Sequence, residues 1–277
     1  MKFANMHLHS TFSDAGFTPE QLVLIGKSLG YKALILTDHE TDGGVRELMR
    51  FARAEGGVDV IAGIEFYGMH EGKCLHLVAL DYDMEDPALR AFVAERVRLR
   101  NECTERCFER GVRLGQIDGV TWQDVVDLHG EGAWLCIDSI RNAYRKKRIP
   151  FPSDFREKVI NAPEAKAFRP KNPTAKEVIR TVRGAGGIVA LAHPYLQTHF
   201  VPALVGMGLN GIEVSHPDNR ENTSALAAAM AERYGLYRCG GTDHTGAMSG
   251  CDGPNAIPAL QGITEEEYAT LKERRLG

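Results

Sequence analysis

The stretch Met6-His7-Leu8-His9-Ser10 ends the first predicted strand, residues 2–8, and Asp14 follows it in the next loop. Side chains two positions apart in a strand point to the same face, so the two imidazoles are expected to be neighbours. Two imidazoles with a carboxylate nearby can begin a divalent-metal site. Because many His-x-His pairs are surface residues or satisfied core residues, the prediction depends on finding further ligands elsewhere in the chain.

Strands and helices alternate on both flanks of the chain. Strands are predicted over residues 2–8, 31–36, 58–64, 73–80, 187–192, 209–214 and 236–240. Helices are predicted after the N-caps Thr18 and Thr174 and over residues 44–55, 223–234 and 264–275. This alternation favours a parallel α/β architecture.

The middle of the chain has a different character. A long helix rich in Arg and Glu is predicted over residues 87–113, and shorter helices are predicted after Thr121 and over residues 137–147. Several prolines follow, and no strong strand pattern appears between residues 84 and 173. We therefore predict one α/β domain made of residues 1–86 and 171–277, with residues 87–170 as a helical insertion that caps its active face.

The composition excludes several classes of protein. The chain has 277 residues, of which 43% are hydrophobic and 25% charged, and its net charge of -4 gives no bias toward nucleic acid or anionic membranes. No apolar run approaches the ~20 residues of a membrane-spanning helix, and no signal-peptide pattern precedes the first strand. The six cysteines form no CxxC pair and no disulfide framework. We expect a cytoplasmic protein.

The candidate ligands gather at or near strand ends, where parallel α/β enzymes place their chemistry. They are His7, His9, Asp14, His39, Glu65, His76, His193, Asp243 and His244, of which His76 lies within its strand. Imidazole and carboxylate donors without an organised thiolate suit Mn, Fe or Zn. The number of donors predicts two or three divalent ions that share a bridging carboxylate, an arrangement that activates water and binds phosphoryl oxygens.

The order of these motifs resembles the PHP (polymerase and histidinol phosphatase) family of the amidohydrolase superfamily. The motifs are His-x-His-Ser at 7–10, Thr-Asp-His at 37–39, Gly-Ile-Glu at 63–65, His76, Ala-His-Pro at 192–194 and Gly-Thr-Asp at 241–243. The resemblance implies a distorted (β/α)7 barrel with a metal cluster at the C-terminal ends of its strands. It also implies hydrolysis of a small phosphorylated metabolite by attack of a metal-bound hydroxide on phosphorus. The substrate would be a nucleotide, nucleoside bisphosphate, sugar phosphate or cyclic phosphate ester.

Carried over residue by residue, the family pattern assigns the ligands to three ions. His7, His9 and Asp243 would bind the first, His76 and His193 the second, and Glu65 would bridge the two. Asp14 and His39 would hold the third. The family has a histidine two residues after the last aspartate, whereas His244 follows Asp243 directly here. Either His244 reaches the third ion through a changed loop, or that ion has a different partner.

Two further residues are candidates for binding or catalysis. His216 follows the strand 209–214 on the same face, where it would bind phosphate or protonate the leaving oxygen, a role that Asp243 could share. The alternative for His216 is a loop histidine bonded to the backbone. Arg141 in the insertion is a candidate phosphate ligand, because a guanidinium group suits bidentate phosphate contacts, and a solvated helix face is its alternative.

Two other functions compete with the phosphoesterase hypothesis. A C–N hydrolase is possible because amidohydrolases share His-x-His, but Glu65 takes the place of their carboxylated lysine. A non-catalytic PHP scaffold would have lost ligands, whereas almost all are present. The expected partner is a small phosphorylated substrate, with no membrane and no stable nucleic-acid complex, and the oligomeric state is left open.

Overall fold

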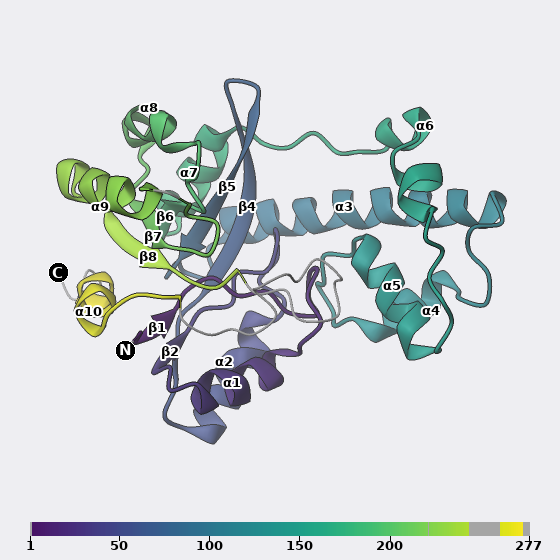
Figure 1. The fold of residues 1–277 in the computed structure, drawn as a ribbon, viewed down its shortest axis with the longest axis horizontal. Helices are drawn as coiled ribbons and strands as arrows, with labels where there is room; N and C mark the ends of the chain where they lie inside the picture. The colour runs from purple at the N-terminus through teal and green to yellow at the C-terminus, as the bar shows by residue number, and fades with distance from the viewer. Residues whose placement is uncertain (1, 221, 244–260, 274–277) are drawn as a thin grey trace.

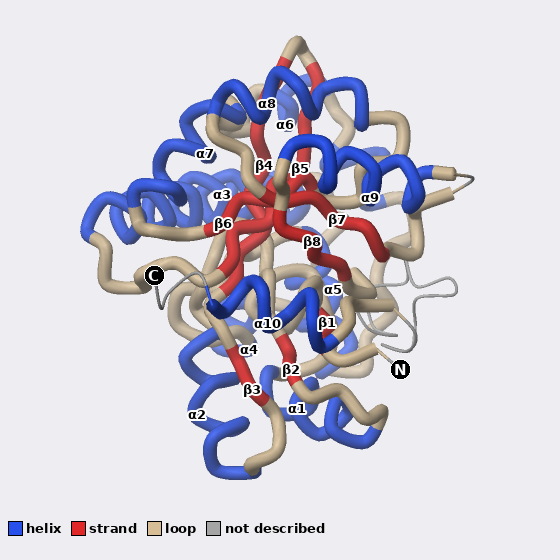
Figure 2. The backbone as a smooth tube through the Cα atoms, turned by 90° about the vertical axis from the view of Figure 1, so that its left-hand side faces the viewer, coloured by secondary structure: helices blue, strands red, loops and turns tan. Residues whose placement is uncertain are grey.

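The computed structural model describes residues 2–220, 222–243 and 261–273. The strands lie together and helices surround them (Figures 1 and 2). The long helix α3 extends away from the strands. The fold is a mixed α/β fold. Among the described residues, no helix has the length and apolar character needed to cross a membrane.

The described strands form two sheets. The first is parallel and contains β1 (Ala4–Asn5), β2 (Ala33–Leu34) and β3 (Asp59–Val60) in that order. The second contains β4 (Gly63–His70), β5 (Lys73–Leu80), β6 (Ile188–Leu191), β7 (Gly211–Ser215) and β8 (Tyr237–Gly240). β5 is antiparallel to both β4 and β6, whereas β6, β7 and β8 are parallel.

The prediction of a parallel architecture was wrong at β4 and β5. These strands are joined by the two residues Glu71 and Gly72, both with positive φ, 45° and 75°. A two-residue connection of this handedness matches the twist of a hairpin and can only join antiparallel strands.

The predicted strand 58–64 was also wrong, because the chain changes sheets inside it. β3 pairs with β2, and after Ile61 and Ala62 the chain begins β4, which pairs with β5. Glu65 is therefore the third residue of an eight-residue strand and does not follow a strand end.

Backbone hydrogen bonds connect the two sheets at both edges. The amide of Met6, just after β1, donates to the carbonyl of Gly240 at the end of β8 (3.0 Å). At the other edge the amide of Glu40 donates to Glu65 O (2.8 Å), and the amide of Glu65 donates to Asp38 O (3.2 Å). The residues that follow β1 and β2 are thus held against the second sheet, which brings the His-x-His stretch beside β4 and β8.

Helices cover the outside of the sheets. They are α1 (Pro19–Ser28), α2 (Val45–Glu55), α7 (Ala175–Gly184), α8 (Val201–Met207), α9 (Thr223–Tyr234) and α10 (Glu265–Glu273). The predicted capping boxes are present at Thr18 and Thr174, whose side chains accept from the amides of Gln21 and Glu177. A 3-10 turn, Thr198–Phe200, precedes α8, a helix that the sequence did not predict.

Residues 84–173, all of which the structure describes, contain no strand. They form α3 (Pro87–Arg113), α4 (Trp122–Leu128), α5 (Ile137–Lys146), a π-helical turn (Arg156–Ile160) and α6 (Pro163–Lys166). Their apolar side chains, including Phe108, Val125, Tyr144 and Phe155, form a hydrophobic cluster of their own. The buried Arg96 of α3 donates from Nε to Glu40 (3.0 Å) and from Nη1 to Lys171 O (3.0 Å). This ion pair fixes the start of α3 to the loop that follows His39.

Candidate metal centre

The structure brings most of the predicted ligands together. Four groups of side chains each offer ligand atoms within 4.8 Å of one another: His7, His9, Glu65 and Asp243; Glu65, His76 and His193; His9, Asp14 and His39; and His7, Glu213 and His216. His244 lies outside the described residues. The remaining eight predicted ligands come from the ends of β1, β2, β6 and β8 and from the interiors of β4 and β5.

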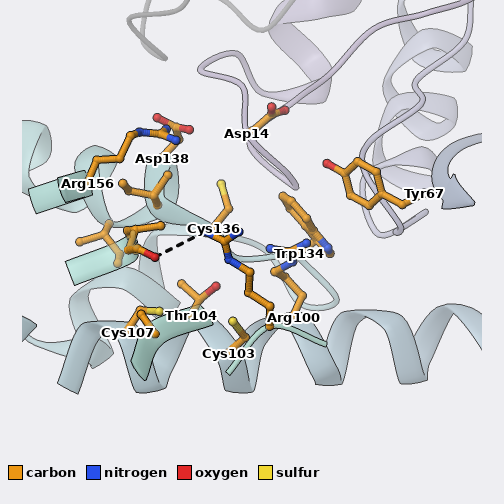
Figure 3. A pocket seen from close by; sticks show the side chains of 15 residues that line it. Asp14, Tyr67, Arg100, Cys103, Thr104, Cys107, Trp134, Cys136, Asp138 and Arg156 are labelled. Atoms are coloured by element: carbon orange, nitrogen blue, oxygen red, sulfur yellow. Dashed lines mark hydrogen bonds between the residues drawn. The ribbon is translucent and has the colours of Figure 1, made fainter. Parts of the chain in front are cut away.

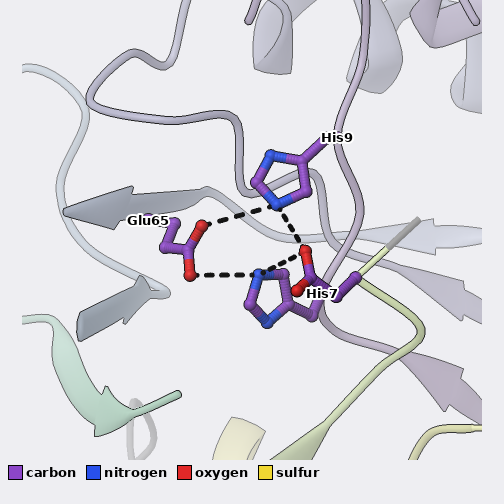
Figure 4. Close-up of side chains that lie close together, drawn as sticks. His7, His9 and Glu65 are labelled. Atoms are coloured by element: carbon purple, nitrogen blue, oxygen red, sulfur yellow. Dashed lines mark ion pairs between the residues drawn. The ribbon is translucent and has the colours of Figure 1, made fainter. Parts of the chain in front are cut away.

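The first group brings two imidazoles against two carboxylates (Figure 4). His9 Nε2 lies 2.9 Å from Asp243 Oδ1 and 3.4 Å from Glu65 Oε2. His7 Nε2 lies 3.4 Å from Glu65 Oε1 and 3.5 Å from Asp243 Oδ1. Among the described residues these two ring nitrogens have no hydrogen-bond partner, although both are buried. Unpaired nitrogens facing carboxylate oxygens are satisfied by a cation, so this donor set fits a divalent metal.

Glu65 is the carboxylate that the first two groups share. Its Oε1 lies 2.9 Å from His76 Nδ1 and 3.2 Å from His193 Nε2, and its Oε2 lies 2.9 Å from His39 Nδ1. The side chain is 1% exposed. A carboxylate with imidazoles at both oxygens has the position expected of a bridging ligand, and that role remains a prediction.

Asp14, His9 and His39 form a looser group. Asp14 lies 3.6 Å from His9 Nδ1 and 3.6 Å from His39 Nε2. The serines of the loop that carries Asp14 are held by the buried Asp38, which accepts from Ser10 N (2.7 Å) and Ser10 Oγ (2.6 Å). Asp38 therefore shapes the loop that carries Asp14.

The charges of the centre compensate one another. Burial would raise the pKa of Glu65, but His76, His7 and His39 hold this pKa well below its usual range. Burial likewise opposes the ionisation of Asp243, yet His7, His216 and His9 keep its pKa well below the usual value. Burial lowers the pKa of His7, and the carboxylates of Glu213, Asp243 and Glu65 reverse this and raise it well above 6.5. The site therefore favours ionised carboxylates and needs positive charge among them.

His216 lies beside the first group, as its position after the strand suggested. Its Nε2 is 3.3 Å from Asp243 Oδ2, and its Nδ1 accepts from the amide of Asp218 (3.0 Å). Since Nδ1 is an acceptor, the ring proton is on Nε2 and faces Asp243. The sequence had offered two alternatives for His216, a backbone hydrogen bond or a place in the site. The residue makes both contacts.

Glu213 also belongs to the site, although it was not among the residues predicted from the sequence. This carboxylate on β7 is 0% exposed and lies 2.8 Å from His7 Nδ1. The only signal was an acidic residue inside the apolar strand Gly211–Ser215, which on its own also fits an outward-facing position.

A cavity of about 410 Å³ connects the third group to the insertion (Figure 3). Its lining includes Asp14 and Tyr67 on one side and Arg100, Trp134 and Arg156 on the other. The Arg100 guanidinium lies 4.5 Å from the Trp134 ring centroid, and this ring is 5.4 Å from that of His39. Arg100 Nε and Trp134 Nε1 are buried donors with no hydrogen-bond partner among the described residues.

Arg141 does not line this cavity. Its Nη1 donates to Asp138 (2.7 Å), and its guanidinium lies 5.2 Å from the Phe151 ring centroid. The arginines that do line the cavity are Arg100, Arg156 and Arg169. The described residues include no carboxylate in ion-pair contact with any of these three.

Comparison with known proteins supports a phosphoesterase. A family model described as the PHP domain matches residues 5–98. The chain is 29% identical over 250 residues to a phosphoribosyl 1,2-cyclic phosphate 1,2-diphosphodiesterase of Eggerthella lenta, covering 87% of this chain and 94% of the relative. It is 26% identical over 263 residues to a 3',5'-nucleoside bisphosphate phosphatase of Chromobacterium violaceum, covering 86% of each. A crystal structure from Bifidobacterium adolescentis, assigned as a metal-dependent phosphoesterase, superposes with a TM-score of 0.78 at 25% identity and covers 99% of this chain and 96% of its own.

Proposed function

We propose that this chain, a PHP-domain phosphoesterase, hydrolyses a small phosphate ester that carries a second anionic group. One observation supports this most: the histidine and carboxylate cluster around Glu65 opens at Asp14 into a cavity lined by three arginines, and no carboxylate of the described residues is in ion-pair contact with them. The cluster suits the reacting phosphate, and the arginines suit a second phosphate on the same molecule.

The cluster has the donors for two or three divalent ions, Mn, Fe or Zn. The first site would use His7, His9 and Asp243, the second His76 and His193, with Glu65 shared, and the third Asp14 and His39. When bound, such ions supply Lewis acidity that makes water nucleophilic near neutral pH and neutralises phosphoryl oxygens. The ligand assignment and the number of ions are part of this proposal.

Asp243 and His216 are the residues that we assign to proton transfer. His216 holds its proton on Nε2, 3.3 Å from Asp243 Oδ2, because its Nδ1 accepts from the backbone. His216 therefore holds Asp243 in place through this contact, and Asp243 would carry a proton from the attacking water to the leaving oxygen at the cluster. A positioned acid of this kind contributes about 100-fold to 10,000-fold to the rate.

Substrate recognition is assigned to the cavity. Arg100 Nε and Trp134 Nε1 are unpaired donors, and an anionic acceptor would satisfy both. Nucleoside bisphosphates and phosphorylated cyclic phosphate esters are two classes of molecule that combine a reacting phosphate with a second one. The named activities of the Chromobacterium and Eggerthella relatives fall in these two classes.

We also propose that the two sheets are parts of one distorted (β/α)7 barrel, formed by residues 1–86 and 171–277, with residues 87–170 as its insertion. The proposal is supported by the hydrogen bonds from Met6 to Gly240 and between Glu40 and Glu65, which join the sheets at both edges. In this arrangement the cluster lies at one end of the barrel, and the insertion closes the side of the cavity that faces Asp14.

The test is a screen of phosphate release by the purified chain with Mn added. The substrates are a nucleoside 3',5'-bisphosphate, a phosphorylated cyclic phosphate ester, the matching monophosphates and a short RNA. We expect release from one of the first two classes at a kcat/KM at least tenfold above that for the monophosphates. Equal rates on monophosphates would contradict the role of the cavity. Release from none, with hydrolysis of an amide or lactam in a parallel screen, would favour a C–N hydrolase.

A further inference from the structure

We infer that Glu213 is a positioning residue that orients one ligand histidine at each of the first two metal sites. The inference rests on the metal sites of the proposed function and adds a residue that neither the motifs nor the relatives' names assign. Glu213 acts through the side chain of His7 and the backbone of His193.

The two oxygens of Glu213 have different partners. Oε1 lies 2.8 Å from His7 Nδ1, and Oε2 accepts from the amide of His193 at 2.7 Å. The carboxylate is 0% exposed, so water cannot replace either partner.

The first contact selects the tautomer of His7. The Glu213 carboxylate accepts at both oxygens, so the proton of the neutral His7 ring is on Nδ1. Nε2 then carries the lone pair, and it is this nitrogen that faces Glu65 and Asp243. A ligand histidine that donates its other ring nitrogen to a carboxylate has a fixed orientation and a more basic ligand nitrogen.

The second contact holds the backbone of His193. This residue has a φ of 28°, in the left-handed region that non-glycine residues rarely adopt. Such a conformation persists only where its surroundings enforce it. The hydrogen bond from the His193 amide to Glu213 provides that restraint and directs the imidazole toward Glu65, 3.2 Å from Nε2.

This position requires a carboxylate and would not tolerate an amide. Both partners donate, whereas a glutamine offers one acceptor oxygen and one NH₂ group. In Glu213→Gln, one of two contacts must fail. Either His7 turns to the other tautomer and presents an N–H to the metal, or the His193 amide loses its acceptor. Each outcome weakens one of the two metal sites.

The experiment measures Zn and Mn affinity of the metal-free protein by competition with a chelating dye. We expect Glu213→Gln to lose about 10-fold to 100-fold in affinity, the usual effect of removing an orienting partner. Asp81→Asn is the matched control: it removes another buried carboxylate, which follows β5 beside the start of β6, opposite His193. The control is expected to bind within about twofold of wild type. Affinity of Glu213→Gln equal to that of the control would overturn the inference.

A second measurement needs no variant, in case Glu213→Gln does not fold. In the zinc-loaded wild-type protein, two-bond ¹H–¹⁵N correlation spectra identify the protonated nitrogen of each histidine. We expect His7 to carry its proton on Nδ1, and a proton on Nε2 would overturn the inference. Both readouts are independent of turnover. If the protein binds metal but releases no phosphate, the proposed function fails and the role of Glu213 is still tested.

Discussion

The histidine cluster and the arginine-lined cavity are neighbours, but they are built differently. The cluster takes buried and half-buried side chains from strands and from the loops that follow them, and it pairs every carboxylate with imidazoles. The cavity takes most of its lining from the insertion, which has a separate hydrophobic cluster. Asp14 belongs to both regions. Because the two regions are built from different parts of the chain, we expect the cluster to carry out the phosphoryl chemistry and the insertion to select the substrate.

Glu65→Gln is expected to have the largest effect, because it removes a carboxylate from the cluster and leaves the cavity unchanged. Because both oxygens of Glu65 contact ligand histidines, we expect loss of bound metal and a fall in kcat of at least about 1,000-fold, since metal stabilisation of the transition state is worth several kcal/mol. Metal analysis and phosphate release measure the two effects. A variant that keeps its metal and half of its activity would refute the shared-ligand role.

His216→Ala separates proton transfer from metal binding. We expect kcat to fall about 100-fold, the lower end for a positioned acid, with metal content unchanged. The fall should be smaller for a substrate with an acidic leaving group such as 4-nitrophenol, which needs no protonation. Equal losses on both substrates would contradict a role of the His216–Asp243 pair in protonating the leaving oxygen.

Arg100→Met addresses the insertion. We expect kcat/KM for the doubly anionic substrate to fall about 10-fold to 100-fold, the value of a charged hydrogen bond, with 4-nitrophenyl phosphate unaffected. Arg98→Met on the same helix is the control, because Arg98 is exposed and pairs with Glu95 and Glu102. If the two variants behave alike, the cavity does not select the substrate.

The smallest expected effect lies outside both regions. A hydrogen bond with Glu20, and burial, raise the pKa of Glu47 to about 7. The folded state then binds a proton more tightly than the unfolded state, so this stability is complete below about pH 4.5 and is lost as the pH rises through 7. Glu47→Gln should therefore raise the melting temperature slightly above pH 7 and leave it unchanged at pH 4.5, with normal activity. If the variant is less stable than wild type at pH 8, the pairing of Glu47 with Glu20 is refuted.

Local signals were enough to predict most elements. The N-caps Thr18, Thr121 and Thr174 marked helix starts correctly, because a capping box depends only on residues three apart. The strand β5 was predicted with the bounds that it has, but its antiparallel direction was missed, since a strand has the same pattern in either direction. Its turn, Glu71-Gly72, is a weaker hairpin signal than Asn-Gly. The PHP resemblance was confirmed by the family model over residues 5–98.

The residues of the site could be predicted where a histidine or carboxylate comes at or soon after the end of a predicted strand. His7, His9, Asp14, His39, Glu65, His76, His193 and Asp243 lie together in the structure, although their ligand roles remain predictions. Glu213 could not be chosen, because burial of a residue inside a strand depends on which sheet face it takes. Nor could Arg100 be preferred to Arg141, because the folding of the insertion decides which arginine lines the cavity.

The most direct test of the account is a metal titration of the metal-free wild-type protein. Phosphate release from the preferred substrate is measured as Mn is added in steps below and above equivalence. We predict no release without metal, a rise with added Mn, and a plateau at two or three ions per chain, with Glu65→Gln inactive throughout. Full activity in the metal-free protein, or a loaded protein that releases phosphate from no ester, would contradict it.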